Sequence, residues 1–424
     1  MLDRRFVREN PDAVRDALAR RHVEFDLERL LGLDRRIVEI QGERDGVKAE
    51  QNKLSKSVPT LAGDEKAKAI AASKALGARI KPLEEEAGRL EAELLPLLLE
   101  LPNLPDPEVP EGKDAAGNVE VRRWGEAPTF PFPVKDHLDL ATSLGLLDVE
   151  HAVKLAGSRT YFLKRDLVLL ELAVLRYALD LVASRGYLPH SPPLLVQSGA
   201  MEGTGYLPSG RDQAYELARD DGWLIGTSEV PITALHGGEI LDGARLPLRY
   251  AGISACFRRE AGTYGKDTRG IYRVHQFQKV EQVVVGPGDE AMSRALHEEI
   301  LGNAEDVLKA LKLPYRVVAL CGGDMGRSSA FTYDIETWMP GRDAYGETHS
   351  ASRYYEYQAR RLDLRYRDAE KKVRFCHTLN NTVIASPRIL VAILENYQRE
   401  DGSVDVPEAL QRLVGKERLT AATG

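Results

Sequence analysis

The sequence predicts an α+β protein, in which an antiparallel β-sheet flanked by helices follows an N-terminal antiparallel helical hairpin. Two observations lead to this prediction. Apolar residues recur at an alternating three- and four-residue spacing between residues 30 and 101, and short β-branched stretches joined by loops dominate from about residue 246 onward. We expect an N-terminal domain at residues 1–105, a linker at 106–135 and a larger domain at 136–424.

The N-terminal domain is predicted to contain two long helices joined by a turn. The first apolar stripe runs from Leu30 to Val58, and the second runs from Leu76 to Leu101, with the Pro- and Gly-containing stretch "PTLAGDE" between them. An arm of about 30 residues spans roughly 45 Å at 1.5 Å per residue. Pro82 lies inside the second arm and is expected to kink it.

The charge on this hairpin is uneven along its length. The whole chain has a formal net charge of −7, but residues 44–81 hold nine Lys or Arg against four Asp or Glu. A run of charge is more often a solvated helix face than a binding site. The alternative interpretation is a phosphate-binding tip, held away from a body that would repel polyanions.

Composition restricts the remaining possibilities. Cys256, Cys321 and Cys376 are scattered and show no metal-ligand spacing, which indicates a reducing compartment. The most apolar run, at residues 94–102, is too short to cross a bilayer. No GxGxxG or GxxxxGK[ST] motif occurs. We therefore expect a soluble cytoplasmic protein without a membrane partner, in which any nucleotide site is neither a Rossmann nor a P-loop site.

The stretch "CFRREAGTYGKDTRGIYRVHQFQKVEQVVV" at residues 256–285 concentrates charge where sheet core is expected. We predict one strand at 249–260, a long loop at 261–270 and a returning strand at 271–285. Alternation places Arg258 and Glu260 on one face of the first strand. On the second strand it places these residues on one face: His275, Phe277, Lys279 and Glu281.

An arginine, an aromatic ring and a carboxylate that converge on one sheet face suit a nucleotide better than a core. Arginine binds phosphate in a bidentate manner, and an aromatic ring can stack on a base. Lys266 and Arg269 in the loop are positioned in sequence to close over phosphates. A surface ladder of ion pairs is an equally good interpretation of this stretch taken alone.

Longer motifs in a fixed order favour the nucleotide site. The stretch above resembles motif 2 of the class II aminoacyl-tRNA synthetases, and "RGYLPHSPP" with Pro193 resembles motif 1, which lies at the dimer contact. "GTSEVP" at 226–231 resembles the serine-binding loop of seryl-tRNA synthetases. "ETHSAS" at 347–352 and "HTLNNTVIASPRILVAILENYQ" at 377–398 resemble the metal segment and motif 3 of that family. The resemblance covers essentially the whole chain.

The resemblance implies a role for each matching residue. Arg258 and Arg388 would be the catalytic cations, and Glu347 and Ser350 would hold a divalent metal, expected to be Mg²⁺. The serine pocket would consist of Thr227, Ser228, Glu229, Arg258, Glu281 and Thr382. The ATP site would consist of Arg258, Arg259, Glu260, Val274, Phe277, Glu347, Thr348, His349, Ser350 and Arg388.

The implied activity is that of a serine–tRNA ligase. It would activate L-serine with ATP and transfer serine to the 3′ end of tRNA(Ser), which the hairpin of a homodimer would bind. Charging of tRNA(Sec) with serine is left open. So are two other hypotheses: a ligase that loads serine onto a different acceptor, and an inactive relative that only binds or regulates. Arg259, Ser228, Ala351 and Thr382 depart from the residues usual in the family, without removing a charge that the chemistry needs.

Overall fold

The computed structural model describes residues 1–262 and 269–421. These residues form two compact units. One consists of Leu2–Ala19 and Val23–Pro102, and the other consists of Met1, Arg20–His22 and the chain from Asn103 onward. Lys266, which the sequence placed over the phosphates, lies outside the described residues.

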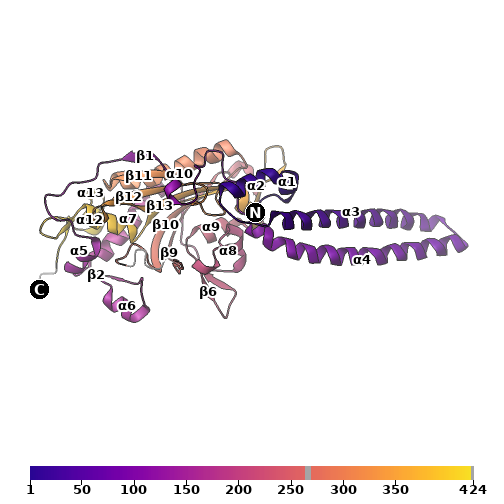
Figure 1. The fold of residues 1–424 in the computed structure, drawn as a ribbon, viewed down its shortest axis with the longest axis horizontal. Helices are drawn as coiled ribbons and strands as arrows, with labels where there is room; N and C mark the ends of the chain where they lie inside the picture. The colour runs from indigo at the N-terminus through magenta and orange to yellow at the C-terminus, as the bar shows by residue number, and fades with distance from the viewer. Residues whose placement is uncertain (263–268, 422–424) are drawn as a thin grey trace. The chain divides into compact units, whose positions relative to one another are not determined.

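The first unit is dominated by the predicted hairpin, which is confirmed. Two short helices, α1 (Arg4–Glu9) and α2 (Pro11–Arg20), precede α3 (Leu27–Ser57) and α4 (Gly63–Glu100). Asp26 caps α3 by accepting a hydrogen bond from the Arg29 amide. The apolar stripes of both arms face each other, and α4 continues as a helix through Pro82. Figure 1 shows the two arms running antiparallel.

One polar position of the hairpin seam has a clear structural role. Gln51 reaches across the seam and donates a 3.1 Å hydrogen bond from Nε2 to the Ser73 carbonyl. A Cβ at Gly77 would lie only 2.8 Å from that same nitrogen, so the glycine makes room for the amide. Because the hydrogen bond forms in one register only, it specifies the alignment of the two arms.

The second unit is built on an eight-stranded sheet with the order β1–β11–β12–β13–β16–β10–β9–β4 (Figure 1). Every neighbouring pair is antiparallel except β4 and β9. The predicted fold class is therefore confirmed. In chain order the strands are β1 (Val119–Trp124), β4 (Leu188–His190), β9 (Leu248–Phe257), β10 (Gln276–Gly286), β11 (Tyr315–Ala319), β12 (Phe331–Met339), β13 (Ala344–Tyr355) and β16 (His377–Ala385).

Helices cover one face of the sheet. The helix α7 (Asp166–Ser184) packs beside α10 (Glu290–Ala310). Gln282 on β10 donates a 3.1 Å hydrogen bond to the Ile300 carbonyl of α10, so even-numbered residues of β10 face this layer. Its odd-numbered neighbours, including Glu281, therefore face the opposite side. That side is where the cavities described below are found.

Smaller elements complete the unit. Within the described residues, this unit also contains four small sheets of two or three strands and seven more α-helices. The strands are β2 (Leu147–Asp148), β3 (Phe162–Leu163), β5 (Leu195–Val196), β6 (Tyr215–Leu217), β7 (Gly222–Leu224), β8 (Ile240–Asp242), β14 (Arg365–Arg367), β15 (Val373–Phe375), β17 (Val404–Asp405) and β18 (Arg418–Leu419). The helices are α5 (His137–Ser143), α6 (Glu150–Ala156), α8 (Ser198–Thr204), α9 (Glu229–Thr233), α11 (Tyr357–Leu362), α12 (Arg388–Asn396) and α13 (Glu408–Val414).

The structure differs from the predicted elements at three places. β9 ends at Phe257 and β10 begins at Gln276, so the two strands are shorter than predicted at the loop between them. The segment 106–135 contributes β1, which pairs with β11 at the sheet edge, so a linker is too simple an interpretation. No strand was predicted at 344–355, where β13 lies between β12 and β16 in the middle of the sheet.

None of the helices in the described part of the chain combines the length and the apolar content needed to cross a bilayer.

Candidate active site

Two β-bulges decide which side chains face the cavities. On β13, Asp334 of β12 pairs with Ser350, but Glu336 pairs with Glu347, so one residue of β13 is extra. That extra residue, Thr348, moves Glu347 onto the same face as Ser350, where strict alternation would have turned it away. On β16 Val383 is extra in the same sense, because Val280 pairs with Ile384 and Glu281 pairs with Thr382.

Three adjoining cavities open on this face, and Arg258 and Glu347 line all of them. The first cavity is narrow and includes Val274, Phe277 and Arg388. The second, of about 470 Å³, extends to Glu229 and Glu281 and to the loop 326–329. The third, of about 450 Å³, includes Glu260 and Tyr206. Arg258 and Glu347 thus mark the centre of one continuous site.

Arg258 is held where the cavities meet. Its guanidinium lies 5.3 Å from the ring centroid of Phe277, and its Nε donates a 3.3 Å hydrogen bond to the Gly226 carbonyl. A cation over an aromatic face is stabilised by about 0.5–2 kcal/mol, and the contact restricts the rotamers of its side chain. Arg258 follows the end of β9 and is not part of it, so its position depends on these contacts and not on strand alternation.

Arg388 begins α12 directly after β16 and is fixed by three partners. Its Nη1 lies 2.9 Å from Glu347 Oε1 and donates a 3.1 Å hydrogen bond to the Glu347 carbonyl. Its guanidinium lies 4.8 Å from the ring centroid of Tyr272, whose hydroxyl donates to that same carbonyl at 3.0 Å. The arginine is therefore pre-organised at the wall of the first cavity.

The carboxylates beside Ser350 are crowded. Burial would raise the pKa of Glu347, but Arg388 and Arg258 outweigh it and leave that pKa below its ordinary value. The pKa of Asp334 is raised well above its ordinary value, first by burial and then by the charge of Glu347. One oxygen of Asp334, Oδ1, is buried without a hydrogen-bond partner.

These residues fit the predicted magnesium ion. Two carboxylates and the Ser350 hydroxyl are the hard oxygen donors that Mg²⁺ prefers, and a cation would satisfy the orphaned oxygen of Asp334. Within residues 1–262 and 269–421, no cluster of three or more His, Cys, Asp or Glu has metal-binding geometry. The remaining ligands would thus have to be phosphate oxygens and water, which is the usual situation for Mg²⁺.

The deep end of the second cavity is formed by Glu281, of which only 1% is exposed. Its carboxylate accepts hydrogen bonds from Thr382 Oγ1 at 3.1 Å and from Asn380 Nδ2 at 3.0 Å, and it pairs with Lys279 Nζ at 2.5 Å. Thr382 and Lys279 line the same cavity. A small polar ligand that reached this end would meet a fixed set of donors and acceptors.

Glu229 forms the neighbouring wall. It accepts hydrogen bonds from the Tyr206 hydroxyl at 2.8 Å, Gln358 Nε2 at 2.8 Å and Asn380 Nδ2 at 2.7 Å. Burial, followed by the charge of Glu281, raises the pKa of Glu229. Asn380 donates to both carboxylates through one nitrogen and so fixes the position of Glu229 relative to Glu281.

Three of the predicted residues have a different placement. Thr227 is buried, and its Oγ1 accepts a hydrogen bond from the Glu229 amide at 3.2 Å, so it orders the start of α9. Ser228 is also buried, and its Oγ donates to the Gly252 carbonyl at 3.4 Å. The Arg259 side chain is exposed. None of the three lines the cavities described above, and their substrate contacts stay predictions.

Burial makes two histidines near the site weak bases. Burial lowers the pKa of His349 to about 3, and its Nδ1 shares a 2.8 Å hydrogen bond with Thr348 Oγ1. Burial likewise lowers the pKa of His377 to about 4, where its ring bonds to Ser293 at 2.7 Å. His275 Nδ1 is 2.9 Å from the Arg258 carbonyl. The first two therefore stay neutral near pH 7.

Sequence reasoning missed several residues that complete the site. Asn380 lies two residues before Thr382 on β16, so alternation alone would have placed it on the same face. No such signal marks Asp334, Tyr206 and Gln358. They reach the site through the bulge at Thr348 and through the packing of α8 and α11. Lys279 was placed on the correct face, but its pairing with Glu281 was not foreseen.

Comparison with known proteins agrees with this geometry. Residues 1–105 match the model of the seryl-tRNA synthetase N-terminal domain. Residues 215–397 match the class II tRNA synthetase core domain of the G, H, P, S and T group. A serine–tRNA ligase of Deinococcus radiodurans is 46% identical and covers 98% of each chain. One of Symbiobacterium thermophilum is 45% identical over 99% of this chain and 100% of its own.

Solved structures give the same answer. The seryl-tRNA synthetase of Pyrococcus horikoshii complexed with ATP is 40% identical, with a TM-score of 0.93 over 100% of both chains. The cytoplasmic serine–tRNA ligase of Naegleria fowleri in complex with AMP is 32% identical, with a TM-score of 0.88, covering 100% of this chain and 99% of its own. By its sequence and its fold, the chain belongs to the seryl-tRNA synthetase family of class II aminoacyl-tRNA synthetases.

Proposed function

We propose that the chain is an ATP-dependent serine–tRNA ligase. It joins L-serine to ATP, releases pyrophosphate and holds seryl-adenylate, and then transfers serine to the 3′ end of tRNA(Ser). The observation that carries this proposal is the buried Glu281–Thr382 pair, which ends a cavity whose other end is shared with Arg258 and Glu347. A serine whose hydroxyl bonded to this pair would place its carboxylate toward Arg258.

In the first step an oxygen of the serine carboxylate attacks the α-phosphorus of ATP, and pyrophosphate leaves. Charge builds on the phosphoryl oxygens, so fixed cations lower the barrier more than a general base would. We assign Arg258 to the α-phosphate and the serine carboxylate, and Arg388 to the leaving phosphates. Phe277, Val274 and Glu260, which line the first or third cavity, are assigned to the adenosine.

Glu347 and Ser350 are assigned to Mg²⁺. Bound there, the ion would neutralise phosphate charge and fix the direction in which pyrophosphate leaves. Arg388, whose Nη1 lies 2.9 Å from Glu347 Oε1, holds that carboxylate in place.

In the second step the 3′ hydroxyl of tRNA attacks the carbonyl carbon of seryl-adenylate, and AMP leaves. His349 cannot accept this proton near pH 7, because burial holds its pKa at about 3. The raised pKa of Asp334 favours its protonated form, which cannot take up a proton, and the oxygens of Glu229 already accept hydrogen bonds from Tyr206, Gln358 and Asn380. A non-bridging oxygen of the adenylate phosphate remains as the nearest acceptor that the substrate itself brings.

The function is tested directly by serine-dependent exchange of pyrophosphate into ATP, followed by transfer of labelled serine to tRNA. Both are expected. Exchange without transfer to tRNA would favour the ligase with another acceptor, and the absence of exchange would favour the inactive relative. Whether tRNA(Sec) is also charged is decided by the same transfer assay with that tRNA.

Selection for serine should depend on the Thr382 hydroxyl. Alanine is smaller than serine and cannot be excluded by size, so it must be rejected because it leaves buried hydroxyl partners unpaired, which discriminates by roughly 10⁴. Thr382→Ala should lower kcat/KM for serine far more than for alanine, and should admit threonine into the vacated space. Pyrophosphate exchange with the three amino acids measures this. An unchanged serine-to-alanine ratio would mean that Thr382 does not read the hydroxyl.

We further propose a homodimer. Leu169 and Leu172 on α7 are 43% and 57% exposed, and Leu188 on the edge strand β4 is 57% exposed, close in sequence to Pro193. Exposed leucines beside an open sheet edge suit an isologous interface. Sedimentation should give about twice the chain mass of 47.0 kDa, and Leu172→Asp should shift the population toward monomer. A fully active monomer at micromolar concentration would contradict the dimer.

We assign the binding of tRNA to the N-terminal hairpin, on the basis of the family and of the basic residues on that hairpin. The exposed lysines of the hairpin, Lys48, Lys53 and Lys56, are assigned to tRNA phosphates. We place the reaction in the cytoplasm, whose reducing conditions agree with the free state of all three cysteines.

A further inference from the structure

The loop Gly326–Ala330, between β11 and β12, forms one wall of the second cavity. Gly326, Arg327, Ser328 and Ser329 line it together with Arg258 and Glu281. Among the lining residues Ser209, Gly326 and Arg327 are exposed, so they mark where the cavity opens to solvent. The cavity thus leads from an opening that carries Arg327 to the centre of the site.

The backbone of this loop is held by two distant segments. Asn103 donates from its amide to the Arg327 carbonyl at 2.8 Å and from Nδ2 to the Ser328 carbonyl at 2.9 Å. The Asp106 amide donates to the Ala330 carbonyl at 2.9 Å. Arg21, which is 3% exposed, donates from Nη1 to the Gly326 carbonyl at 3.2 Å and from Nη2 to the Ser329 carbonyl.

Every carbonyl of the loop therefore accepts a hydrogen bond from Arg21, Asn103 or Asp106. Carbonyls held in this way turn toward these segments and leave the amides and side chains of the loop to face elsewhere. Burying an arginine costs desolvation energy. The hydrogen bonds that Arg21 donates are to backbone carbonyls and not to a carboxylate, so they fix the backbone of the loop. Such an arrangement fixes one loop conformation.

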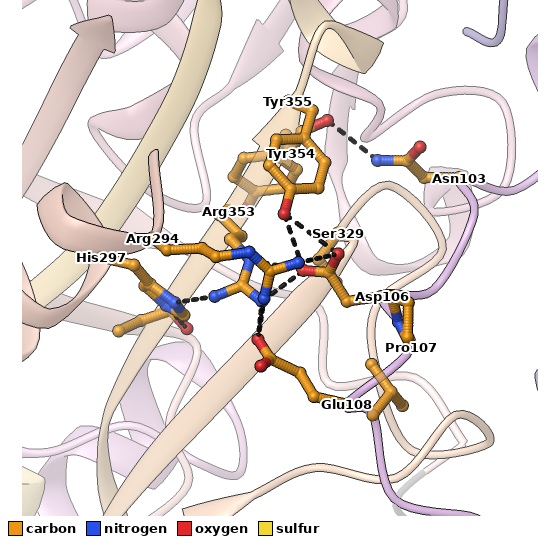
Figure 2. Close-up of polar contacts among 12 residues, drawn as sticks. Asn103, Asp106, Pro107, Glu108, Arg294, His297, Ser329, Arg353, Tyr354 and Tyr355 are labelled. Atoms are coloured by element: carbon orange, nitrogen blue, oxygen red, sulfur yellow. Dashed lines mark hydrogen bonds and ion pairs between the residues drawn. The ribbon is translucent and has the colours of Figure 1, made fainter. Parts of the chain in front are cut away.

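The segment after Asn103 is itself anchored. Arg353 on β13 pairs with Asp106 and with Glu108, and its Nε donates to Asp106 Oδ2 at 2.6 Å (Figure 2). The Tyr355 hydroxyl donates to the same carboxylate at 2.9 Å, and Arg294 on α10 pairs with it at 3.0 Å. Asp106 is 5% exposed, so this is a buried ionic cluster whose loss would be costly.

The two holding segments are also the two ends of the hairpin in the sequence. Arg21 precedes α3, which begins at Leu27, and Asn103 follows α4, which ends at Glu100. The two segments that hold the loop are thus continuous in sequence with the two ends of the hairpin.

We propose that the loop Gly326–Ala330 receives the 3′-terminal nucleotides of tRNA and that Asn103, which holds this loop, is a positioning residue for the transfer step. The inference rests on the proposed function. While AMP occupies the first cavity, the 3′ hydroxyl must reach the carbonyl carbon beside Arg258 from another direction. The second cavity opens on that point, and Arg327 at its opening suits a terminal phosphate.

The test separates transfer from activation. Asn103→Ala should lower the single-turnover rate of transfer from preformed seryl-adenylate to tRNA by about tenfold or more, since small misplacements near reacting atoms have effects of this size. The KM values for ATP and serine in pyrophosphate exchange should stay unchanged. Arg327→Ala, at an exposed position, should raise the KM for tRNA severalfold and leave exchange unchanged.

Asn396→Ala is the matched control. Asn396 Nδ2 also donates to two backbone carbonyls, those of Trp338 and Ala392, both at 2.8 Å, but it does not touch the loop. Its transfer and exchange rates should keep the wild-type ratio.

Three outcomes would overturn the inference. The first is an Asn103→Ala enzyme whose transfer rate equals that of the wild type. The second is an Asn103→Ala enzyme whose transfer and exchange rates fall by the same factor, as they would in a generally destabilised protein. The third is an Arg327→Ala enzyme with an unchanged KM for tRNA, which decides the matter if Asn103→Ala does not fold. A wild-type protein without serine-dependent exchange would instead refute the proposed function.

Discussion

Glu281→Gln is expected to reduce kcat/KM for serine in pyrophosphate exchange by about 10²–10³-fold. The substitution keeps the shape of the side chain but removes the charge that pairs with Lys279 at 2.5 Å in a buried setting. Removing one partner of a buried, hydrogen-bonded charge pair costs about 2–5 kcal/mol, and each 1.4 kcal/mol is a factor of ten. The amide would also turn an NH₂ group toward either Thr382 or Asn380.

A second buried glutamate provides the control. Glu305 is 6% exposed, pairs with Arg122 at 2.7 Å and accepts a hydrogen bond from the Tyr315 hydroxyl at 2.9 Å, away from the cavities. Glu305→Gln should lower the melting temperature without changing the KM for serine. If both variants lost exchange only in proportion to stability, Glu281 would be a structural residue and the serine site would lie elsewhere.

Replacing the hairpin between Leu30 and Leu97 by a short turn is expected to abolish charging of tRNA while serine-dependent exchange persists. The cavities proposed to bind ATP and serine are lined entirely by residues of the second unit. The arm supplies the excess of basic residues in an acidic chain. Contacts to phosphates supply a large share of the affinity of a protein for nucleic acid, so removing the arm is expected to weaken tRNA binding strongly.

A milder variant tests the charge itself. Substituting Lys48, Lys53 and Lys56 by glutamine should weaken tRNA binding and lower the slope of log K against log salt by about one per lost phosphate contact. The matched control replaces Glu84, Glu85 and Glu93 near the base by glutamine, which should leave the slope unchanged or steepen it. Charging that survived the deletion at the wild-type rate would assign the arm another purpose.

Much of the site was predictable because strand alternation holds along β10. Phe277, Lys279 and Glu281 share one face, as the sequence indicated, and all three line the cavities. The heptad spacing of the hairpin was equally reliable, because both arms bury the predicted stripe against each other. Long periodic patterns are informative since each repeat adds to the same face.

Prediction failed where periodicity was interrupted. Glu347 and Ser350 are three residues apart and share a face only through the extra residue Thr348, which leaves no mark in the composition of β13. β13 itself was missed because its Gly, Glu and Ala residues have weak strand preference, and its central position in the sheet overrides that preference. Tyr206 and Gln358 reach Glu229 through tertiary packing alone.

The two bulges have a consequence for how this sequence can vary in length. In an ordinary strand a one-residue deletion shifts the register, and the chain can often absorb the shift in a nearby loop. Deleting Thr348 would restore perfect pairing between β12 and β13, and so would appear harmless to the sheet. Glu347 and Ser350 would then be two residues apart in a regular strand and would still share one face. Deleting Val383 would likewise leave Thr382 and Ala385 two residues apart on one face. Losing the extra residue of a bulge thus keeps the same side chains toward the cavities, whereas a deletion elsewhere in these strands turns the following side chains to the other face.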